Sequence, residues 1–199
     1  MSKPPRPHTP SQTVGPFFHL GLTGPRAVGR IAGPGVEGER IWLTCRVLDG
    51  DGAPVNDALI EIWQADAQGR YHHPDDPRSH SGNPEFLGFG RQETGENGSC
   101  SFETIKPGAY PWENHPNAWR PAHVHFSLFG HAFATRLVTQ MYFPGDPLFP
   151  FDPIFNSIPD ERARQRLIAQ FDFQETEPAW ALGYRFDIVL RGREETPFE

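Results

Sequence analysis

Two histidines spaced two residues apart carry the clearest chemistry in this sequence. His123 and His125 lie in the segment WRPAHVHF, which has the character of a β-strand, and Arg120 precedes them by three residues. Because residues i and i+2 of a strand share a face, both imidazoles can reach one ion. Imidazole binds zinc, copper, iron and nickel. The spacing therefore indicates a metal site, although two histidines on a solvated strand face would show the same pattern.

The usual completions of a two-histidine motif are absent. An HxHxD motif would need an aspartate where Ser127 stands, and the glutamate that continues a cupin motif is missing as well. A zinc site would use cysteine or further histidine, and Cys45 and Cys100 are far away in the sequence. The flanking loops instead offer Tyr71 and Tyr110, two of only four tyrosines in the chain.

Two tyrosines beside two histidines would suit ferric iron. A free phenol has a pKa near 10, and a strongly charged ion can deprotonate a ligand bound to it. Two phenolates and two imidazoles would hold a hard cation that favours anionic oxygen. Each tyrosine taken alone is an ordinary partly buried aromatic residue, so only the joint pattern indicates iron.

The elements that must position these residues are mainly strands. A hairpin-type turn is expected at residues 49–52, and a helix from Ser157 to about Phe171, capped by Ser157 or Asp160. Long irregular segments at 69–91, 109–122 and 144–153 separate the strands. Alternation of apolar residues predicts an antiparallel β-sandwich with long loops and one short helix, whose strands span 41–48, 58–65, 98–108, 123–130, 134–143 and 184–192.

Composition narrows the functional class. The 199 residues suit one domain, divided here into an N-terminal arm (1–30) and a sandwich domain (31–199). A net charge of −7 without a basic cluster argues against nucleic acid, and no apolar run is long enough for a membrane. With no signal-peptide pattern and only two cysteines, we expect a cytoplasmic protein with reduced thiols.

Longer blocks of the sequence resemble a known family. The blocks GRYHH, TIKPGAYPWENHPNAWRPAHVHF, TQMYFPGDPL and YRFDIVLRG resemble, in order, the intradiol ring-cleaving dioxygenases of the protocatechuate 3,4-dioxygenase type. The resemblance runs from PSQTVGPFF to the terminal PFE. It implies a β-sandwich that cleaves a catechol-type ring, protocatechuate or a related compound, between its hydroxylated carbons. Dioxygen and non-heme Fe(III) would be used, and a cis,cis-muconate would be formed.

The resemblance also implies a role for each candidate residue. Tyr110 resembles the axial phenolate that leaves the iron when substrate binds, and Arg120 resembles the cation that stabilises the activated substrate. The iron ligands would be Tyr71, Tyr110, His123 and His125; the catalytic residues Arg120, Tyr110 and Gln140; and the substrate-binding residues Gly15, Pro16, Trp112 and Ile154.

Two kinds of chain are mixed in this sequence. The head, PSQTVGPFFHLGL, and the length resemble the iron-free chain of the family, whereas the middle and tail resemble its iron chain. We therefore expect a homo-oligomer, or a hetero-oligomer with a related chain, with the arm lining its own or a neighbour's site. The family's tyrosine that faces the substrate carboxylate is missing, and Glu113 stands where the iron chain tends to be basic, so the ring substituent stays open.

Three other interpretations fit parts of the sequence. VLDGDGAPVNDALIEIW would suit a transthyretin-like or carbohydrate-binding sandwich, and the two histidines would suit a zinc or copper enzyme. A catalytically silent partner chain of a dioxygenase complex is the third. The joint presence of Tyr71, Tyr110, His123 and His125 distinguishes the dioxygenase from a binding module and weighs against a silent partner chain. Colour and metal analysis would separate it from a zinc or copper enzyme.

Overall fold

The computed structural model describes residues 15, 17, 19–78, 82–112, 115–130 and 136–199. Two short α-helices, α1 (Pro153–Asn156) and α2 (Glu161–Gln165), and three 3-10 turns, His19–Gly21, Gly24–Arg26 and Phe149–Phe151, accompany the strands. The strands are β1 (Arg40–Leu48), β2 (Leu59–Gln64), β3 (Phe89–Glu93), β4 (Ser99–Ile105), β5 (Tyr110–Pro111), β6 (Trp119–Arg120), β7 (His123–Phe129), β8 (Leu137–Tyr142), β9 (Gln170–Phe171) and β10 (Leu182–Val189).

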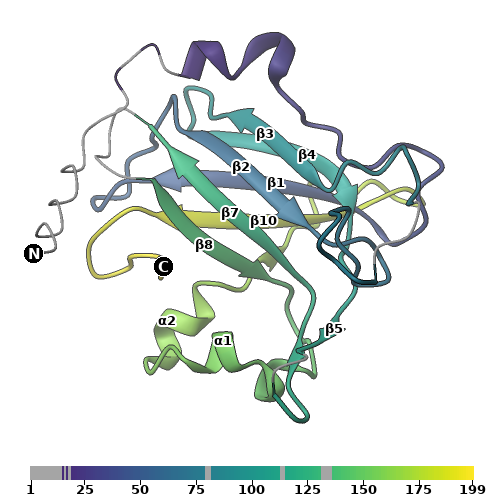
Figure 1. Cartoon of the computed structure of the whole chain (residues 1–199). Coiled ribbons are helices and arrows are strands. Elements are labelled where there is room, and N and C mark those ends of the chain that lie inside the picture. The colour runs from purple at the N-terminus through teal and green to yellow at the C-terminus, as the bar shows by residue number, and fades with distance from the viewer. Residues whose placement is uncertain (1–14, 16, 18, 79–81, 113–114, 131–135) are drawn as a thin grey trace, which may run out of the picture.

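Two four-stranded sheets pack face to face as a β-sandwich, which confirms the predicted fold class (Figure 1). The first sheet has the order β4-β1-β10-β9 and the second the order β3-β2-β7-β8, while β5 and β6 pair separately. One pairing departs from the antiparallel prediction, because β1 and β10 run parallel. A long crossover lies between these two strands, and such a connection permits parallel pairing where a tight hairpin does not.

The second sheet has one apolar face and one polar face. Ile62 of β2 and Phe126 of β7 are neighbours in register and point into the core. On the opposite face, Trp63 lies beside His125, and His125 lies beside Gln140 of β8. Burying a large apolar side chain stabilises the fold by about 1.5–3 kcal/mol, so the core fixes which face the histidines must take.

The predicted turn at residues 49–52 reverses the chain but does not join paired strands. The amide of Asp49 donates to the carbonyl oxygen of Ala53 over 2.9 Å, and Leu48 then bridges Pro54 in antiparallel fashion. The chain next crosses to the other sheet, where β2 pairs with β3 and β7 instead of β1.

The prediction of a single helix from Ser157 to about Phe171 is wrong. Two short helices stand there and just before, and only α2 falls within the predicted range. Asp160 caps α2 as expected, since its carboxylate accepts a hydrogen bond from the amide of Arg162 over 2.9 Å. Ser157 instead ends α1.

Sheet-like hydrogen bonds end α2 early. The amide of Tyr142, at the end of β8, donates to the carbonyl oxygen of Leu167 over 2.7 Å, and Ala169 donates back to Tyr142 over 2.8 Å. These bonds take the backbone groups that a continuing helix would need. Leu167 is buried against Tyr142, so packing favours the extended conformation over the helical one suggested by periodicity.

Strand β3 lies where the sequence indicated the end of a long loop. Gly90 occupies an inward position of β3 opposite Ile62. A Cβ atom there would come within 2.7 Å of Ile31 and 2.9 Å of Phe102. Because neighbouring side chains fill this space, the strand has a glycine in place of an inward apolar residue and shows no alternation.

The last residues of the predicted arm are tied to both sheets. Val28 bridges Arg91 of β3, and Arg30 bridges Glu103 of β4. The division into an arm (1–30) and a domain (31–199) stays a prediction, because residues 1–14, 16 and 18 lie outside the described residues. Within the described part of the chain, no helix is long and apolar enough to span a membrane.

Candidate metal centre and active-site cleft

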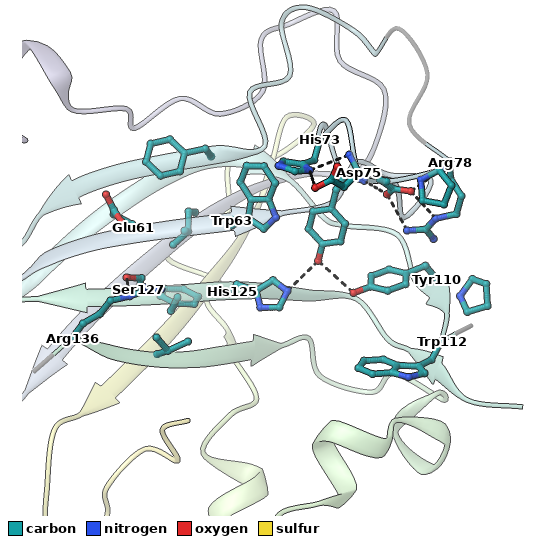
Figure 2. Close-up of a pocket in the computed structure, with 18 residues that line it drawn as sticks. Glu61, Trp63, His73, Asp75, Arg78, Tyr110, Trp112, His125, Ser127 and Arg136 are labelled. Carbon is teal, nitrogen blue, oxygen red and sulfur yellow. Dashed lines mark hydrogen bonds and ion pairs between the residues drawn. The ribbon is translucent and has the colours of Figure 1, made fainter. Parts of the chain in front are cut away.

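The four predicted ligands come from three parts of the chain and meet on the outer face of the second sheet. Figure 2 shows two of them, Tyr110 and His125. The hydroxyl oxygen of Tyr71 lies 3.1 Å from Nε2 of His125, 3.3 Å from Nε2 of His123 and 3.5 Å from the hydroxyl oxygen of Tyr110. That oxygen of Tyr110 lies 3.4 Å from Nε2 of His123, and the two imidazole Nε2 atoms are 3.2 Å apart.

These spacings fit four ligands of one ion. Donor atoms about 2.0–2.1 Å from a metal in a tetrahedral arrangement lie roughly 3.3–3.4 Å from one another. The five measured separations span 3.1 to 3.5 Å. Among the residues that the structure describes, no group of three or more His, Cys, Asp or Glu side chains could hold a metal, so the two histidines have tyrosines as their partners.

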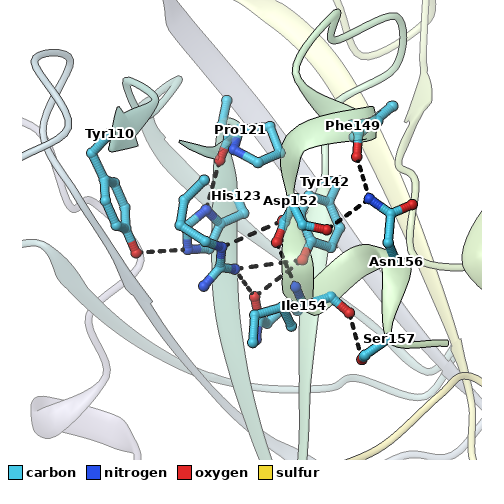
Figure 3. A network of polar contacts seen from close by, with 12 residues as sticks. Tyr110, Pro121, His123, Tyr142, Phe149, Asp152, Ile154, Asn156 and Ser157 are labelled. Carbon is cyan, nitrogen blue, oxygen red and sulfur yellow. Dashed lines mark hydrogen bonds and ion pairs between the residues drawn. The ribbon is translucent and has the colours of Figure 1, made fainter. Parts of the chain in front are cut away.

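A backbone contact orients the buried imidazole of His123. Its Nδ1 lies 2.7 Å from the carbonyl oxygen of Pro121 (Figure 3). A carbonyl oxygen only accepts, so Nδ1 of His123 carries the hydrogen. Its Nε2 is then left with a free lone pair, which points to the space between the four ligand atoms. Metal-binding histidines are commonly fixed by such a contact.

Burial sets the charge state of Tyr71, His123 and His125. Desolvation, with the positive charge of Arg120 second, lowers the pKa of His125 to about 4 and the pKa of His123 well below its usual value. Both imidazoles are therefore neutral, which is the form that binds a metal. Desolvation also raises the pKa of Tyr71, with Tyr110 adding to the effect, so this phenol needs a cation nearby to ionise.

Aromatic packing holds the Tyr71 ring. The Trp63 ring stacks on it with a centroid separation of 5.8 Å and an interplanar angle of 9°. The Tyr71 amide also donates to the carboxylate of Asp76 over 2.8 Å. Tyr110 is positioned differently, because it starts β5 and pairs through its backbone with Arg120 of β6.

Arg120 is the centre of a buried polar network (Figure 3). Its guanidinium donates to Asp152 over 3.4 Å, to the side-chain oxygen of Gln140, and to the hydroxyl of Tyr142 over 3.4 Å. It also lies 5.4 Å from the centroid of the Trp112 ring. Two of the predicted catalytic and substrate-binding residues, Gln140 and Trp112, thus lie against the Arg120 guanidinium.

A cleft of about 790 Å³ opens beside three of the four donors. Tyr71, Tyr110, Trp112 and His125 line it, and it continues along the sheet past Ser127 and Val138. Its polar floor and aromatic walls suit a small planar ligand with hydroxyl groups.

Not every predicted residue reaches this cleft. Gln140 and Ile154 line a separate cavity of about 230 Å³ on the far side of Arg120. Gly15 is half-buried, and a Cβ atom added to it would meet no other atom within 4 Å. Pro16 lies outside the described residues. The substrate-binding roles of Ile154, Gly15 and Pro16 stay predictions.

Sequence reasoning missed several residues that support the centre. Trp63 could have been found, because it shares with Glu61 the strand face that points away from the core. Tyr142 follows Gln140 by two residues and therefore shares its face. Asp76 and Asp152 gave no signal, since each lies in a loop whose path only the fold defines.

Comparison with known proteins places these observations in context. A family model described as dioxygenase matches residues 19–192. The chain is 61% identical to the protocatechuate 3,4-dioxygenase beta chain of Burkholderia cepacia over 162 residues, which cover 81% of this chain and 68% of the relative. It is 36% identical to the alpha chain from the same species over 202 residues, which cover 96% and 95%.

Solved structures of dioxygenases have a fold similar to that of this chain. Hydroxyquinol 1,2-dioxygenase from Pseudomonas putida superposes with a TM-score of 0.64 at 25% identity, covering 91% of this chain and 65% of that one. The dioxygenase domain of a carbohydrate-binding fusion protein from a Streptomyces species has a TM-score of 0.61 at 26% identity, covering 92% and 98%.

Proposed function

Since this chain belongs to the intradiol ring-cleaving dioxygenase family and is an oxidoreductase acting on catechol-type rings, we propose that it works on one ferric ion held by Tyr71, Tyr110, His123 and His125. The observation that carries this proposal is the spacing of 3.1 to 3.5 Å in five of the six pairs of their donor atoms. The orientation of His123 by Pro121 supports it, as does the neutral state of both imidazoles.

The ion, when bound, would act as a Lewis acid that holds both catechol oxygens and makes their hydroxyl protons easier to remove. Tyr110 would then act as the base, since its phenolate oxygen can leave the centre and take up a proton from the substrate. Tyr71 would keep its place, because Trp63 stacks on its ring and Asp76 holds its backbone.

Arg120 would stabilise the negative charge that develops on the substrate ring during ring opening. Its own charge is fixed in place by Asp152 and Gln140, so little reorganisation is needed as the reaction proceeds. Trp112 lies between this guanidinium and the cleft and would form one wall of the ring-binding site.

The substrate we propose is a catechol, with protocatechuate the first compound to test, because two relatives are named protocatechuate 3,4-dioxygenase chains. Similarity to both an alpha and a beta chain supports an oligomer, built from copies of this chain or with a related one. The free thiols of Cys45 and Cys100 support a cytoplasmic location.

Oxygen uptake by the purified chain tests this function. Catechol, protocatechuate and hydroxyquinol would be offered separately, and consumption of one dioxygen per ring with formation of a muconate-type product is expected for at least one of them. Absence of uptake with all three, by folded protein that contains iron, would contradict it. Family membership leaves the transthyretin-like binding module without support, and the convergence of all four donors weighs against a silent partner chain.

A further inference from the structure

An arginine outside the predicted ligand set lies against the tyrosine that the proposed mechanism needs to move. The guanidinium carbon of Arg78 is 4.8 Å from the centroid of the Tyr110 ring. Both side chains line the cleft, and Figure 2 shows Arg78 next to Tyr110 at one end of it. Arg78 comes from the loop that follows Tyr71, so the segment that supplies one tyrosine covers the ring of the other.

Asp76 holds this arginine in place. Its carboxylate accepts from Nε of Arg78 over 3.1 Å and from Nη2 over 3.0 Å, and it also accepts from the Arg78 amide over 2.8 Å. The second oxygen of the same carboxylate accepts from the Tyr71 amide over 2.8 Å. One nearly buried carboxylate therefore fixes the backbone of Tyr71 and the cation over Tyr110 together.

The contact favours one position of Tyr110 over another. A cation is attracted to the electron-rich face of an aromatic ring, and the ring of a metal-bound phenolate carries more negative charge than that of a neutral phenol. The attraction is therefore strongest while Tyr110 is in its resting place. It weakens when the ring turns away and its oxygen takes up a proton.

We propose that Arg78 is a positioning residue that holds Tyr110 in its resting place and sets how readily substrate displaces it, which rests on the ferric site proposed above. Arg78 is suited to an adjustable contact, because its side chain is 30% exposed, whereas Arg120 is buried and faces Trp112 instead of Tyr110. Tyr71 has no arginine stacked on it among the contacts that the structure describes; its neighbour is Trp63.

The Arg78→Met variant tests this role through the colour of the iron-loaded protein and through anaerobic binding of catechol. Loss of the nearby cation raises the energy of the phenolate electrons, so the charge-transfer band should move to longer wavelength. Catechol should displace Tyr110 about two- to fivefold more readily, in both the binding rate and the equilibrium constant. Arg78→Lys, which keeps the charge, should restore most of both properties.

Two controls separate the contact from a general effect. Arg91→Met removes an arginine that also pairs with a carboxylate, Glu61, and also lies over a ring, Phe89, yet touches neither tyrosine of the site. It should leave the band and the binding rate unchanged. In a Tyr110→Phe background, Arg78→Met should leave the rate of catechol binding unchanged, because the phenolate that the substrate would displace is absent.

The outcomes are distinguishable. Iron-containing Arg78→Met protein with an unshifted band and normal catechol binding would overturn the role of Arg78 and leave the ferric site intact. Loss of iron in both Arg78→Met and Arg78→Lys would also overturn it, since the arginine would then support the fold of the Tyr71 loop. Wild-type protein that binds no iron would overturn the ferric site and this inference together.

Discussion

The four donor atoms at the centre are supported in unequal ways. Tyr71 is stacked on Trp63 and tied to Asp76 through its backbone. Tyr110 is held by the short β5–β6 pair and by the partly exposed Arg78. At the ferric site proposed above, this difference would let the Tyr71 phenolate stay while the Tyr110 phenolate moves.

Substitution of the two tyrosines should therefore have different effects. Tyr110→Phe should keep iron but slow catechol binding and turnover, because the departing base is lost while three donors remain. Tyr71→Phe should lose iron or most of the visible colour. Iron content and absorption spectra of both variants check this, and equal loss of iron in both would contradict the assigned roles.

Replacement of Arg120 should reduce turnover more than binding. Loss of a preorganised electrostatic group typically lowers kcat on the order of 100- to 1,000-fold, so Arg120→Ser should show that loss with a smaller change in KM. Steady-state kinetics at saturating oxygen would measure both constants. Near-normal kcat would remove Arg120 from the mechanism.

The same variant needs a stability control. Arg120 and Asp152 are a buried pair, and removal of one partner from such a pair costs about 3–5 kcal/mol. Denaturant unfolding should accompany the kinetics, and kcat should be compared only at temperatures where the variant is folded. Asp152→Asn, which keeps the arginine, should weaken catalysis less than Arg120→Ser does.

At the scale of the elements, the outer face of the second sheet organises the site. Strand β7 supplies both histidines, β2 supplies Trp63 beside them, and β8 supplies Gln140 and Tyr142. The opposite faces of these strands are apolar and buried. Their burial fixes the register, so a shift of one residue would turn the histidines into the core.

One close contact in the sandwich gives a test of this packing. Gly90→Ala would place a Cβ within 2.7 Å of Ile31 and 2.9 Å of Phe102, and overpacking of this kind typically costs about 1–3 kcal/mol. Thermal or urea unfolding would measure the change. Ser101→Ala on the exposed face of β4 is the matched control and should have little effect; an unchanged stability of Gly90→Ala would contradict the packing at β3.

The strands with clear alternation, such as β1, β2 and β7, could be predicted from the sequence. The extended segment near Leu167 could not, because its tertiary hydrogen bonds to Tyr142 override a periodicity that suggests a helix. Strand β3 could not be predicted either, because neighbouring side chains fill the space beside Gly90 and the strand has no inward apolar residue there. For the site, the residue types could be proposed in advance by family resemblance. The supporting contacts of Asp76, Arg78 and Asp152 could not, since they depend on how loops fold back.

At the scale of the whole molecule, the chain is similar to both the beta chain and the alpha chain of a protocatechuate 3,4-dioxygenase. If identical copies exchange arms, a closed symmetric homo-oligomer can complete every site, because one chain carries both complementary patches. Activity from this chain expressed alone is the expected result for a homo-oligomer. Activity that appears only after co-expression of a related chain would contradict it.

Removal of the arm should separate metal binding from catalysis. Deletion of residues 1–18 removes none of the four proposed ligands, so iron and colour should remain. Ring cleavage should be abolished, because Gly15 and Pro16 would no longer line a pocket. Iron content and oxygen uptake measured on the same sample check this. Full activity of the shortened chain would show that the arm has no part in the site.

The most direct test of the ferric centre is metal analysis of the purified, folded protein together with its visible spectrum. One iron per chain is expected, with a red-brown colour and a broad visible band from phenolate-to-iron charge transfer. That band should be lost in Tyr71→Phe. Folded protein that is colourless and contains zinc or no metal would contradict the assignment of Tyr71, Tyr110, His123 and His125 as the ligands of a ferric ion.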